Sequence, residues 1–352
     1  MRIGVLTFHR CINYGSYWQA RALVEGLNAR GHQAVLLDHQ SSEVTWREWR
    51  CAFQPTLPHP TPRTDFARYA AKARRFLEAF KLLPESKPFA LDNPHELERF
   101  DTVVVGSDEV WNLKHPWYGG RPLFFGEGLN AERVVSYAAS FGSHDSGEGL
   151  HALYAERLRG FHAISVRDEN SRRHVQQALQ FDPALVLDPV LQFPDVSKVD
   201  AAASAEPYLL LYGHGFPAWY LREVRAAADA RRIKLVSVGY RNPAADEQWL
   251  SAGPIEFARA VAGASGMATN FFHGCVFALL TGKPFAAVSM PYRFHKLRDL
   301  AAAVGADRHL LWEPARTGQI GDLLAAPLDP TIGRNIAALR LRSNAYLDAA
   351  LA

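Results

Sequence analysis

A histidine at the junction of a strand and a helix is the first candidate for chemistry. The segment 269–274 reads Thr-Asn-Phe-Phe-His-Gly and joins an apolar strand pattern to a helical pattern at 275–281. Free backbone N–H groups at a helix N-terminus favour an anion, and an imidazole can donate a proton near neutral pH. We expect His273 to bind a phosphate or to act as a general acid, with Gly274 letting a ligand approach the backbone. The alternative is a histidine whose hydrogen bonds stay within its own loop.

An arginine and a basic stretch supply candidate ligands for anions. Arg167 follows the strand pattern at 163–166, and a guanidinium can bind carboxylate and phosphate groups through two parallel hydrogen bonds. Its alternative role is a salt bridge with the acidic residues beside it in the sequence. The stretch 292–298 places Lys296 and Arg298 near a predicted helix in the second half of the chain. They either bind the same anion as Arg167 or belong to a helix face that is exposed to solvent.

Small and polar residues follow several other strand patterns. Asp108 ends a Gly-Ser-Asp segment at 106–108, and its carboxylate is a candidate to take a proton from a hydroxyl or to cap a turn. Because the carboxyl ends of parallel strands meet at one edge of a sheet, these segments together predict a polar cleft. Its candidate ligand-binding or lining residues are Asn13, Tyr14, Gly15, Ser107 and His214.

Apolar runs between these segments predict the elements that position them. Strand patterns occur at 2–7, 34–37, 102–105, 134–137, 163–166, 185–187, 208–212, 234–238, 266–269 and 285–288. Most are separated by helical patterns, which is typical of parallel α/β sheets, and 352 residues suffice for two domains. We expect an α/β fold of two Rossmann-like domains facing a cleft. The domains are 1–195, with a helical insertion at about 41–95, and 200–330, followed by a C-terminal helix at 331–352.

The insertion contains an amphipathic helical pattern. Phe66, Tyr69, Phe76 and Phe80 recur at helical spacing, and basic residues occupy other positions of the same helix. Burial of the apolar stripe against the first domain is the preferred interpretation. The alternative is a peripheral contact with an anionic membrane.

Five motifs, in order along residues 3–300, resemble those of the polysaccharide pyruvyl transferase family. They are the strand–loop–helix opening at 4–23, the segments at 105–112, 137–142 and 165–169, and Phe-His-Gly at 272–274 followed by Gly-Lys-Pro at 282–284. The resemblance implies a glycosyltransferase-B-like fold and a transfer from phosphoenolpyruvate to a pair of saccharide hydroxyls. The product would be a cyclic ketal, as in bacterial-type surface or exopolysaccharide synthesis. No metal and no cofactor beyond the donor substrate is implied.

Two residues depart from the family pattern. Phe271 stands where the family usually has serine, and Glu109 stands where glutamine is common. These departures bear on contacts with the acceptor more than on the reaction itself.

Composition narrows the classes of function. A net charge of +3 is too weak to indicate nucleic-acid binding, although positive charge gathered in a cleft would suit small anionic substrates. Three cysteines without metal-binding spacing, together with the lack of a long apolar run or signal peptide, favour a cytoplasmic enzyme. A lipid-linked acceptor is compatible with that location. Two other functions stay as alternatives: a nucleotide-sugar glycosyltransferase on the same architecture, and a saccharide-binding protein without catalysis.

Overall fold

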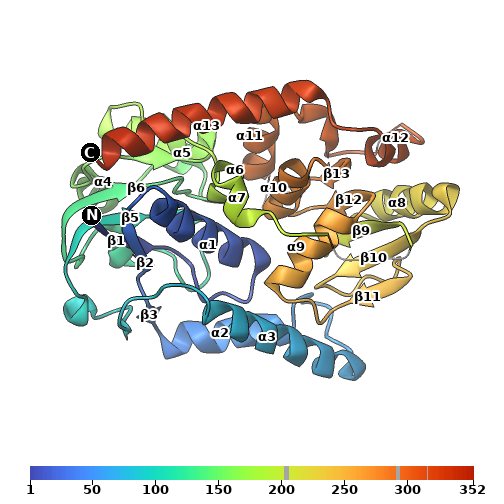
Figure 1. The fold of residues 1–352 in the computed structure, drawn as a ribbon, viewed down its shortest axis with the longest axis horizontal. Coiled ribbons are helices and arrows are strands. Elements are labelled where there is room, and N and C mark those ends of the chain that lie inside the picture. The colour runs from blue at the N-terminus through green and yellow to red at the C-terminus, as the bar shows by residue number, and fades with distance from the viewer. Residues whose placement is uncertain (202–205, 291–293, 315) are drawn as a thin grey trace.

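Two parallel β-sheets, one in each half of the chain, form the framework of the protein (Figure 1). The computed structural model describes residues 1–352 except 202–205, 291–293 and 315. In the first half, four strands pair in the order β2-β1-β5-β6. A short parallel pair, β7 and β8, continues this row through a bridge between Val135 and Ala163. The strands are β1 (Arg2–Leu6), β2 (Gln33–Leu36), β5 (Phe100–Val105), β6 (Ala131–Ser136), β7 (Ser165–Val166) and β8 (Ala184–Leu185).

The second half holds a sheet of six strands in the order β11-β10-β9-β12-β13-β14, and every neighbouring pair is parallel. Apolar residues dominate these strands because helices cover both faces of the sheet. The strands are β9 (Tyr208–Tyr212), β10 (Lys234–Val238), β11 (Glu247–Trp249), β12 (Gly266–Thr269), β13 (Phe285–Val288) and β14 (Leu310–Leu311). The connecting helices include α8 (Ala218–Arg231), α9 (Pro254–Gly263), α10 (Phe272–Thr281), α11 (Phe294–Val304) and α12 (Gln319–Ala325).

The insertion forms two helices below the first sheet in Figure 1, α2 (Ser42–Phe53) and α3 (Phe66–Phe80). The short parallel pair β3 (His39–Gln40) and β4 (Phe89–Ala90) flanks them. Further helices of this half are α4 (Ala152–Arg159), α5 (Glu169–Leu179), α6 (Pro189–Gln192) and α7 (Pro194–Ser197).

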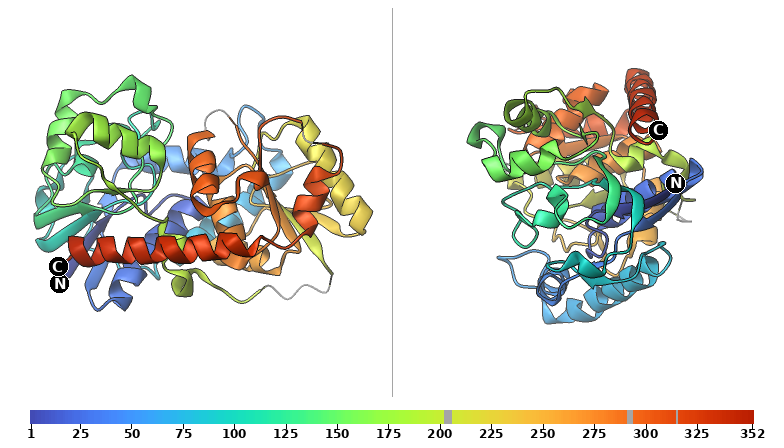
Figure 2. Two further views of the ribbon diagram at one scale, coloured as in Figure 1. Left: turned by 90° about the horizontal axis from the view of Figure 1, so that it is seen from above. Right: turned by 90° about the vertical axis from the view of Figure 1, so that its left-hand side faces the viewer.

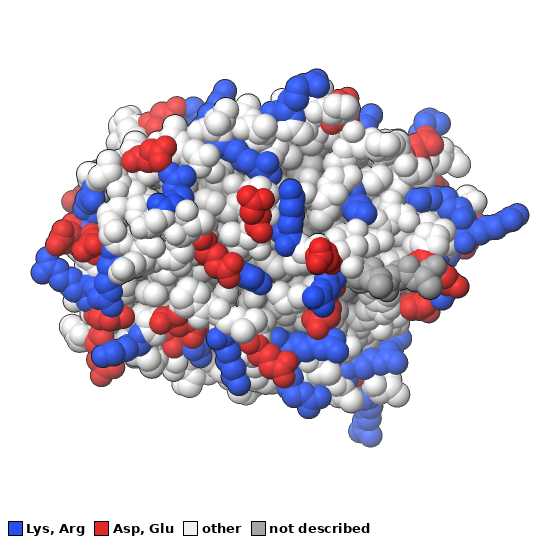
Figure 3. Space-filling model, viewed as in Figure 1, with Lys and Arg blue, Asp and Glu red and all other residues white. Residues whose placement is uncertain are grey.

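Most of the apolar stripe of α3 is buried in the core, which confirms the preferred interpretation of this helix. Tyr69, Phe76 and Phe80 are all buried, whereas Phe66 at the start of the helix and Leu77 are exposed. Lys72, expected on the basic flank, is also buried. On the face shown in Figure 3, acidic and basic side chains are scattered among a larger area of uncharged residues. The buried residues of the stripe are therefore unavailable to lipid. Among the described residues, no helix combines the length and the apolar character needed to cross a bilayer.

One hydrophobic cluster contains residues of both sheets and of the helices packed between them. Helix α1 (Tyr14–Ala29) belongs to the first half but packs against α9 and α10 of the second. The ring of Tyr14 stacks on Phe257 at 4.4 Å, and its hydroxyl donates to the carbonyl of Ala252 at 2.7 Å. The indole of Trp18 donates to the carbonyl of Pro254 at 2.9 Å. These contacts hold the two sheets in one orientation.

The C-terminal helix returns to the first half of the chain. Helix α13 (Pro330–Ala350) begins beside the second sheet and runs along the molecule until its end lies near the N-terminus (Figure 2, left). Near its start, Asn335 donates to the carbonyl of Val304 at 3.1 Å. Near its end, Tyr346 donates to the carbonyl of Ser136 at 2.7 Å, and Asp348 pairs with Arg30. The helix thus ties the two halves together on one side.

Candidate functional site

A cavity of about 340 Å³ lies between the two halves, at the carboxyl ends of strands from both sheets. This is the edge where parallel sheets usually bind ligands, and the volume is at the small end of ligand pockets. We call it the interdomain pocket. Its polar lining includes Asn13, Ser16, Glu48, Lys72, Asp108, Glu109, Arg167, His214, His273 and Lys296.

His273 lies in the first turn of α10, directly after the end of β12. Its Nε2 is 3.4 Å from a carboxylate oxygen of Asp188, which is almost completely buried. Asp188 follows β8 and caps α6 by accepting from the backbone of Val190 at 3.0 Å. Burial raises the pKa of Asp188, but the positive charges of His273 and Arg167 outweigh it and hold the pKa below its ordinary value. An ionised Asp188 therefore lies behind the histidine.

The other side of the His273 ring rests on the first turn of α1. A methyl group at Gly15 would overlap the imidazole, and Nδ1 would be the nearest atom. The side chain of Asn13 caps this helix by accepting from the backbone N–H groups of Gly15 at 2.8 Å and Ser16 at 3.2 Å. Two helix N-termini, each a favourable place for an anion, thus adjoin the same histidine.

Arg167 is held by acidic groups that are distant in the sequence. Its guanidinium donates to Asp188 at 3.1 Å and to Asp108 at 3.3 Å, and it lies 4.6 Å from the ring centre of Phe272. The alternative role predicted for Arg167 is a salt bridge with the acidic residues next to it in the sequence. Its partners are instead Asp108 and Asp188. The side chain of Arg167 is 2% exposed, so these carboxylates use much of the fork that a donor anion would need.

Asp108 faces the same arginine from the end of β5. Its backbone has φ of 76°, a left-handed conformation that residues other than glycine seldom adopt. Its carboxylate accepts from the hydroxyl of Ser16 at 2.9 Å. Burial raises the pKa of Asp108, but the nearby positive charges, Arg167 foremost, outweigh burial and lower the pKa overall. The carboxylate is therefore ionised beside the cation.

Lys296 enters the pocket from α11 of the second half and forms an ion pair with Glu109 of the first. Burial raises the pKa of Glu109, but the charge of Lys296 outweighs burial and lowers the pKa below its ordinary value. On the same helix, Asp299 accepts from the backbone N–H groups of Glu169 at 2.9 Å and Asn170 at 3.2 Å. Helix α11 therefore closes over the first half through both contacts.

Five predicted site residues do not line the pocket. Gly15 packs against the ring of His273, as described above. Tyr14 is an anchor between the two halves, as described above. Ser107 is buried behind Arg167, which donates to its hydroxyl at 3.4 Å. Gly274 leaves room for the side chain of Thr269 rather than for a ligand. Arg298 pairs with its neighbour Asp299 at 2.7 Å and does not line the pocket. Tyr292 and Arg293, in the same predicted basic stretch, lie outside the described residues.

The remaining predicted residues line the pocket from its two sides. Asn13 contributes from the start of α1, and His214 contributes from the loop after β9. The ring of His214 lies 5.5 Å from that of Phe271, so an aromatic side chain occupies the place of the usual serine.

Among the residues not selected from the sequence are Asp188, which lies behind the His273 ring, and two residues that line the pocket, Lys72 and Glu48. Asp188 follows a predicted strand, so its position at a strand end was a usable signal. Lys72 donates to the carbonyl of Gly239 at 3.2 Å, and burial lowers its pKa to about 7. Glu48, on α2, accepts from the indole of Trp117 at 3.2 Å, and burial raises its pKa. The last two come from the insertion, where helical periodicity alone carries no sign of the pocket.

Among the described residues, one group has the spacing of metal ligands, and it lies outside the pocket. His9, Asp38 and Glu85 bring their ligand atoms within 4.8 Å of one another. The guanidinium of Arg10 pairs with Asp38 at 2.9 Å and with Glu85 at 2.8 Å. These ion pairs already balance the carboxylates with a cation.

Comparisons of the whole fold find sugar-nucleotide enzymes at low identity. A structure assigned as a UDP-N-acetylglucosamine 2-epimerase from Listeria monocytogenes has a TM-score of 0.53 at 10% identity, over 96% of this chain and 95% of that chain. UDP-GlcNAc 2-epimerase from Methanocaldococcus jannaschii has a TM-score of 0.51 at 10% identity, over 97% and 99%. At this identity the likeness concerns the fold alone, which is of the glycosyltransferase-B type as predicted.

Sequence comparison identifies the family of the chain more narrowly than the fold does. No curated protein sequence matches it. A family model described as polysaccharide pyruvyl transferase matches residues 13–290. This span contains all the polar residues named above for the pocket except Lys296. The chain belongs to the polysaccharide pyruvyl transferase family.

Proposed function

We propose that this protein transfers a pyruvyl group from phosphoenolpyruvate to two hydroxyls of a saccharide, forming a cyclic ketal. One observation carries the proposal. A histidine backed by a buried carboxylate, His273 with Asp188, shares a small pocket with Arg167, Lys296 and Asp108. Family membership supports the same reaction class.

The donor would bind by replacing internal ion pairs. Phosphoenolpyruvate carries a carboxylate and a phosphate, and Arg167 and Lys296 are the cations placed to receive them. Each now pairs with a carboxylate, Asp108 and Glu109 respectively. A donor that takes over the cations releases these carboxylates from their partners. Asp108, freed from Arg167, then becomes a stronger base.

The reaction would begin with protonation of the donor. His273, whose ring lies beside the carboxylate of Asp188, gives a proton to the methylene carbon of phosphoenolpyruvate, and the adjacent carbon becomes cationic. A saccharide hydroxyl attacks that carbon and loses its proton to Asp108. The C–O bond to phosphate then breaks, and a second hydroxyl closes the ring of the ketal. The balance is one donor and one diol in, and one ketal and one inorganic phosphate out.

The decisive experiment measures phosphate release from phosphoenolpyruvate with a panel of saccharide acceptors, with mass spectrometry of the product. The expected product is heavier than the acceptor by one pyruvyl ketal. Thermal stabilisation by phosphoenolpyruvate should accompany it, because a ligand that binds only the folded state raises stability. Stabilisation by nucleotide sugars instead, without phosphate release, would refute the proposal and favour a glycosyltransferase.

A further inference from the structure

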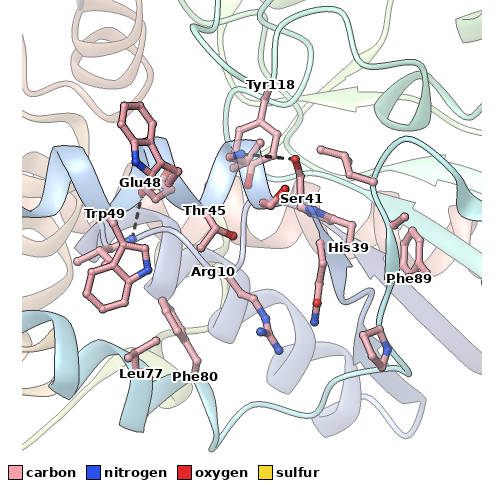
Figure 4. Close-up of a pocket in the computed structure, with 18 of the residues that line it drawn as sticks. Arg10, His39, Ser41, Thr45, Glu48, Trp49, Leu77, Phe80, Phe89 and Tyr118 are labelled. Carbon is pink, nitrogen blue, oxygen red and sulfur yellow. Dashed lines mark hydrogen bonds between the residues drawn. The ribbon is translucent and has the colours of Figure 1, made fainter.

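A second and larger cavity, of about 920 Å³, lies between the first sheet and the insertion (Figure 4). We call it the insertion cavity. Helix α2 and the start of β4 form much of its wall, and α3 contributes Leu77 and Phe80. In Figure 4, Trp49, Leu77 and Phe80 lie together, and Arg10 lies between them and Phe89. None of the residues assigned to the transfer reaction lines this space.

The two cavities meet at two residues. Ile12 and Glu48 line both the insertion cavity and the interdomain pocket. The carboxylate of Glu48 accepts from the backbone of Ile12 at 3.4 Å and from the indole of Trp117 at 3.2 Å. These contacts fix Glu48 at the boundary. A ligand in the insertion cavity would therefore reach, at Glu48, the wall of the pocket where the transfer is proposed to occur.

The lining of the insertion cavity combines aromatic faces with neutral hydrogen-bonding groups. Trp46 is 63% exposed, and Trp49 lies one helical turn further along α2. Amide and hydroxyl groups stand among them: Gln40, Ser41, Ser42 and Thr45. Sugars present apolar C–H faces, which can stack on the aromatic rings, and hydroxyls, which can hydrogen-bond to the polar side chains. Gln40 donates to Asp38 and Ser41 caps α2. A lipid chain would offer no hydrogen-bond partner to the hydroxyls of Ser42 and Thr45, at a cost in free energy.

The charges of the cavity exclude a strongly anionic occupant. Among the described lining residues Arg10 is the only Lys or Arg, and it is paired with Asp38 and Glu85. Burial lowers the pKa of the lining residue His39 to about 3, so its imidazole is neutral. Glu48 and Glu96 add carboxylates to the lining. A phosphate or diphosphate would find no unpaired cation among the described lining residues and would be repelled by the carboxylates. A neutral glycan would not be repelled.

We infer that the insertion cavity binds the acceptor glycan beyond its reacting sugar. Resting on the proposed function, this inference places the sugar that receives the pyruvyl group at Glu48, with further neutral sugar residues along Trp46 and Trp49. The enzyme therefore selects an oligosaccharide or polymer end over a single sugar.

The test uses neutral probes of increasing length. Methyl glycosides of one to four glucose, galactose or mannose residues are titrated by tryptophan fluorescence and by calorimetry. At least one series should bind about tenfold or more tightly as it grows from one to three residues. Trp46→Ala and Thr45→Trp should remove that gain, the first by losing a stacking surface and the second by filling the cavity. Both positions are exposed on α2, so the fold should tolerate both changes.

A matched control and a donor titration separate the possible results. Trp312→Ala removes a tryptophan that is 50% exposed and lines neither cavity, and it should retain the full gain. Three results would each overturn the inference. They are equal affinity for short and long glycosides, loss of the affinity gain in the control variant, and retention of the gain in both cavity variants. Stronger quenching by a polyprenyl phosphate than by any glycoside would also overturn it. Phosphoenolpyruvate should bind all variants with equal affinity. If it fails to bind the unmodified protein, the proposed function is refuted, but the dependence of affinity on glycoside length is unaffected.

Discussion

Lys296 of α11 and Glu109 of the first half form an ion pair across the interdomain pocket. A carboxylate at this position competes with any anionic donor for the lysine. Glutamine, which is common here in the family, would leave the lysine charge uncompensated. The pair therefore sets how strongly the pocket attracts an anion.

Glu109→Gln should tighten the binding of phosphoenolpyruvate by about three- to tenfold, because the donor no longer displaces a carboxylate. Calorimetric titration with the donor measures the change. Glu148→Gln is the matched control, since Glu148 pairs with Lys114 at the surface and should leave donor affinity unchanged. Weaker binding by the Glu109 variant would show that the carboxylate itself supports the donor.

Removal of the proposed acid should stop the reaction without unfolding the protein. His273→Ala is expected to lower kcat by about 10²–10⁴-fold, whereas exposed His162→Ala should retain full activity. Asp188→Asn should lower kcat as well, because the imidazolium loses its buried countercharge. If the two residues act as a unit, the double variant is no slower than His273→Ala alone. Additive losses would instead indicate that Asp188 acts through Arg167, its other partner.

The contact between α1 and His273 gives a test of the position of the proposed acid without a change of its chemistry. Gly15→Ala adds a methyl group that overlaps the His273 ring, so the ring must move. We expect kcat to fall by up to about 10²-fold, as for other small displacements of catalytic groups. Gly333→Ala on α13 is the control, because a methyl group there meets nothing within 4 Å. Unchanged turnover in the Gly15 variant would mean that ring position is not critical.

The buried Lys72 should make stability depend on pH. Burial lowers its pKa from the ordinary 10.5 to about 7, so between these values the unfolded chain binds a proton that the folded protein does not. Stability therefore rises with pH in this window, by about 1.4 kcal/mol per pH unit. Denaturant unfolding of Lys72→Met at pH 7.5 and 9.5 should lack this rise. The exposed Lys81→Met should retain it, and a rise that persists in Lys72→Met would show that the lysine stays charged when buried.

Much of the framework could be predicted from local patterns. Four strands of the second sheet have the bounds that the sequence patterns predicted: β9, β10, β12 and β13. Their patterns are clear because these strands are buried on both faces. The short strands β11 and β14 have too few apolar residues to be recognised. Helix α3 was recognised by its stripe, but only the structure shows that Tyr69 and Phe76 of this stripe are buried in the core.

The site could be predicted only in part, because pairing depends on contacts between distant segments. The strand-end rule indicated His273, Arg167 and Asp108 as separate candidates. It could not show that Asp188, 85 positions before His273, lies behind the imidazole. Nor could it show that Arg167 is already neutralised. Tyr14 looked like a loop residue, yet it begins α1 and its ring faces the second half of the chain.

The hydrophobic core common to both sheets limits how this enzyme can be divided or recombined. Cutting the chain between its halves would expose the rings of Tyr14 and Phe257 to water, so neither half should fold as a separate module. Heating should therefore unfold both halves in one calorimetric transition. A chimera that takes its second half from a relative must also carry over the residues that face α1, or the junction will lose its packing before any substrate is bound.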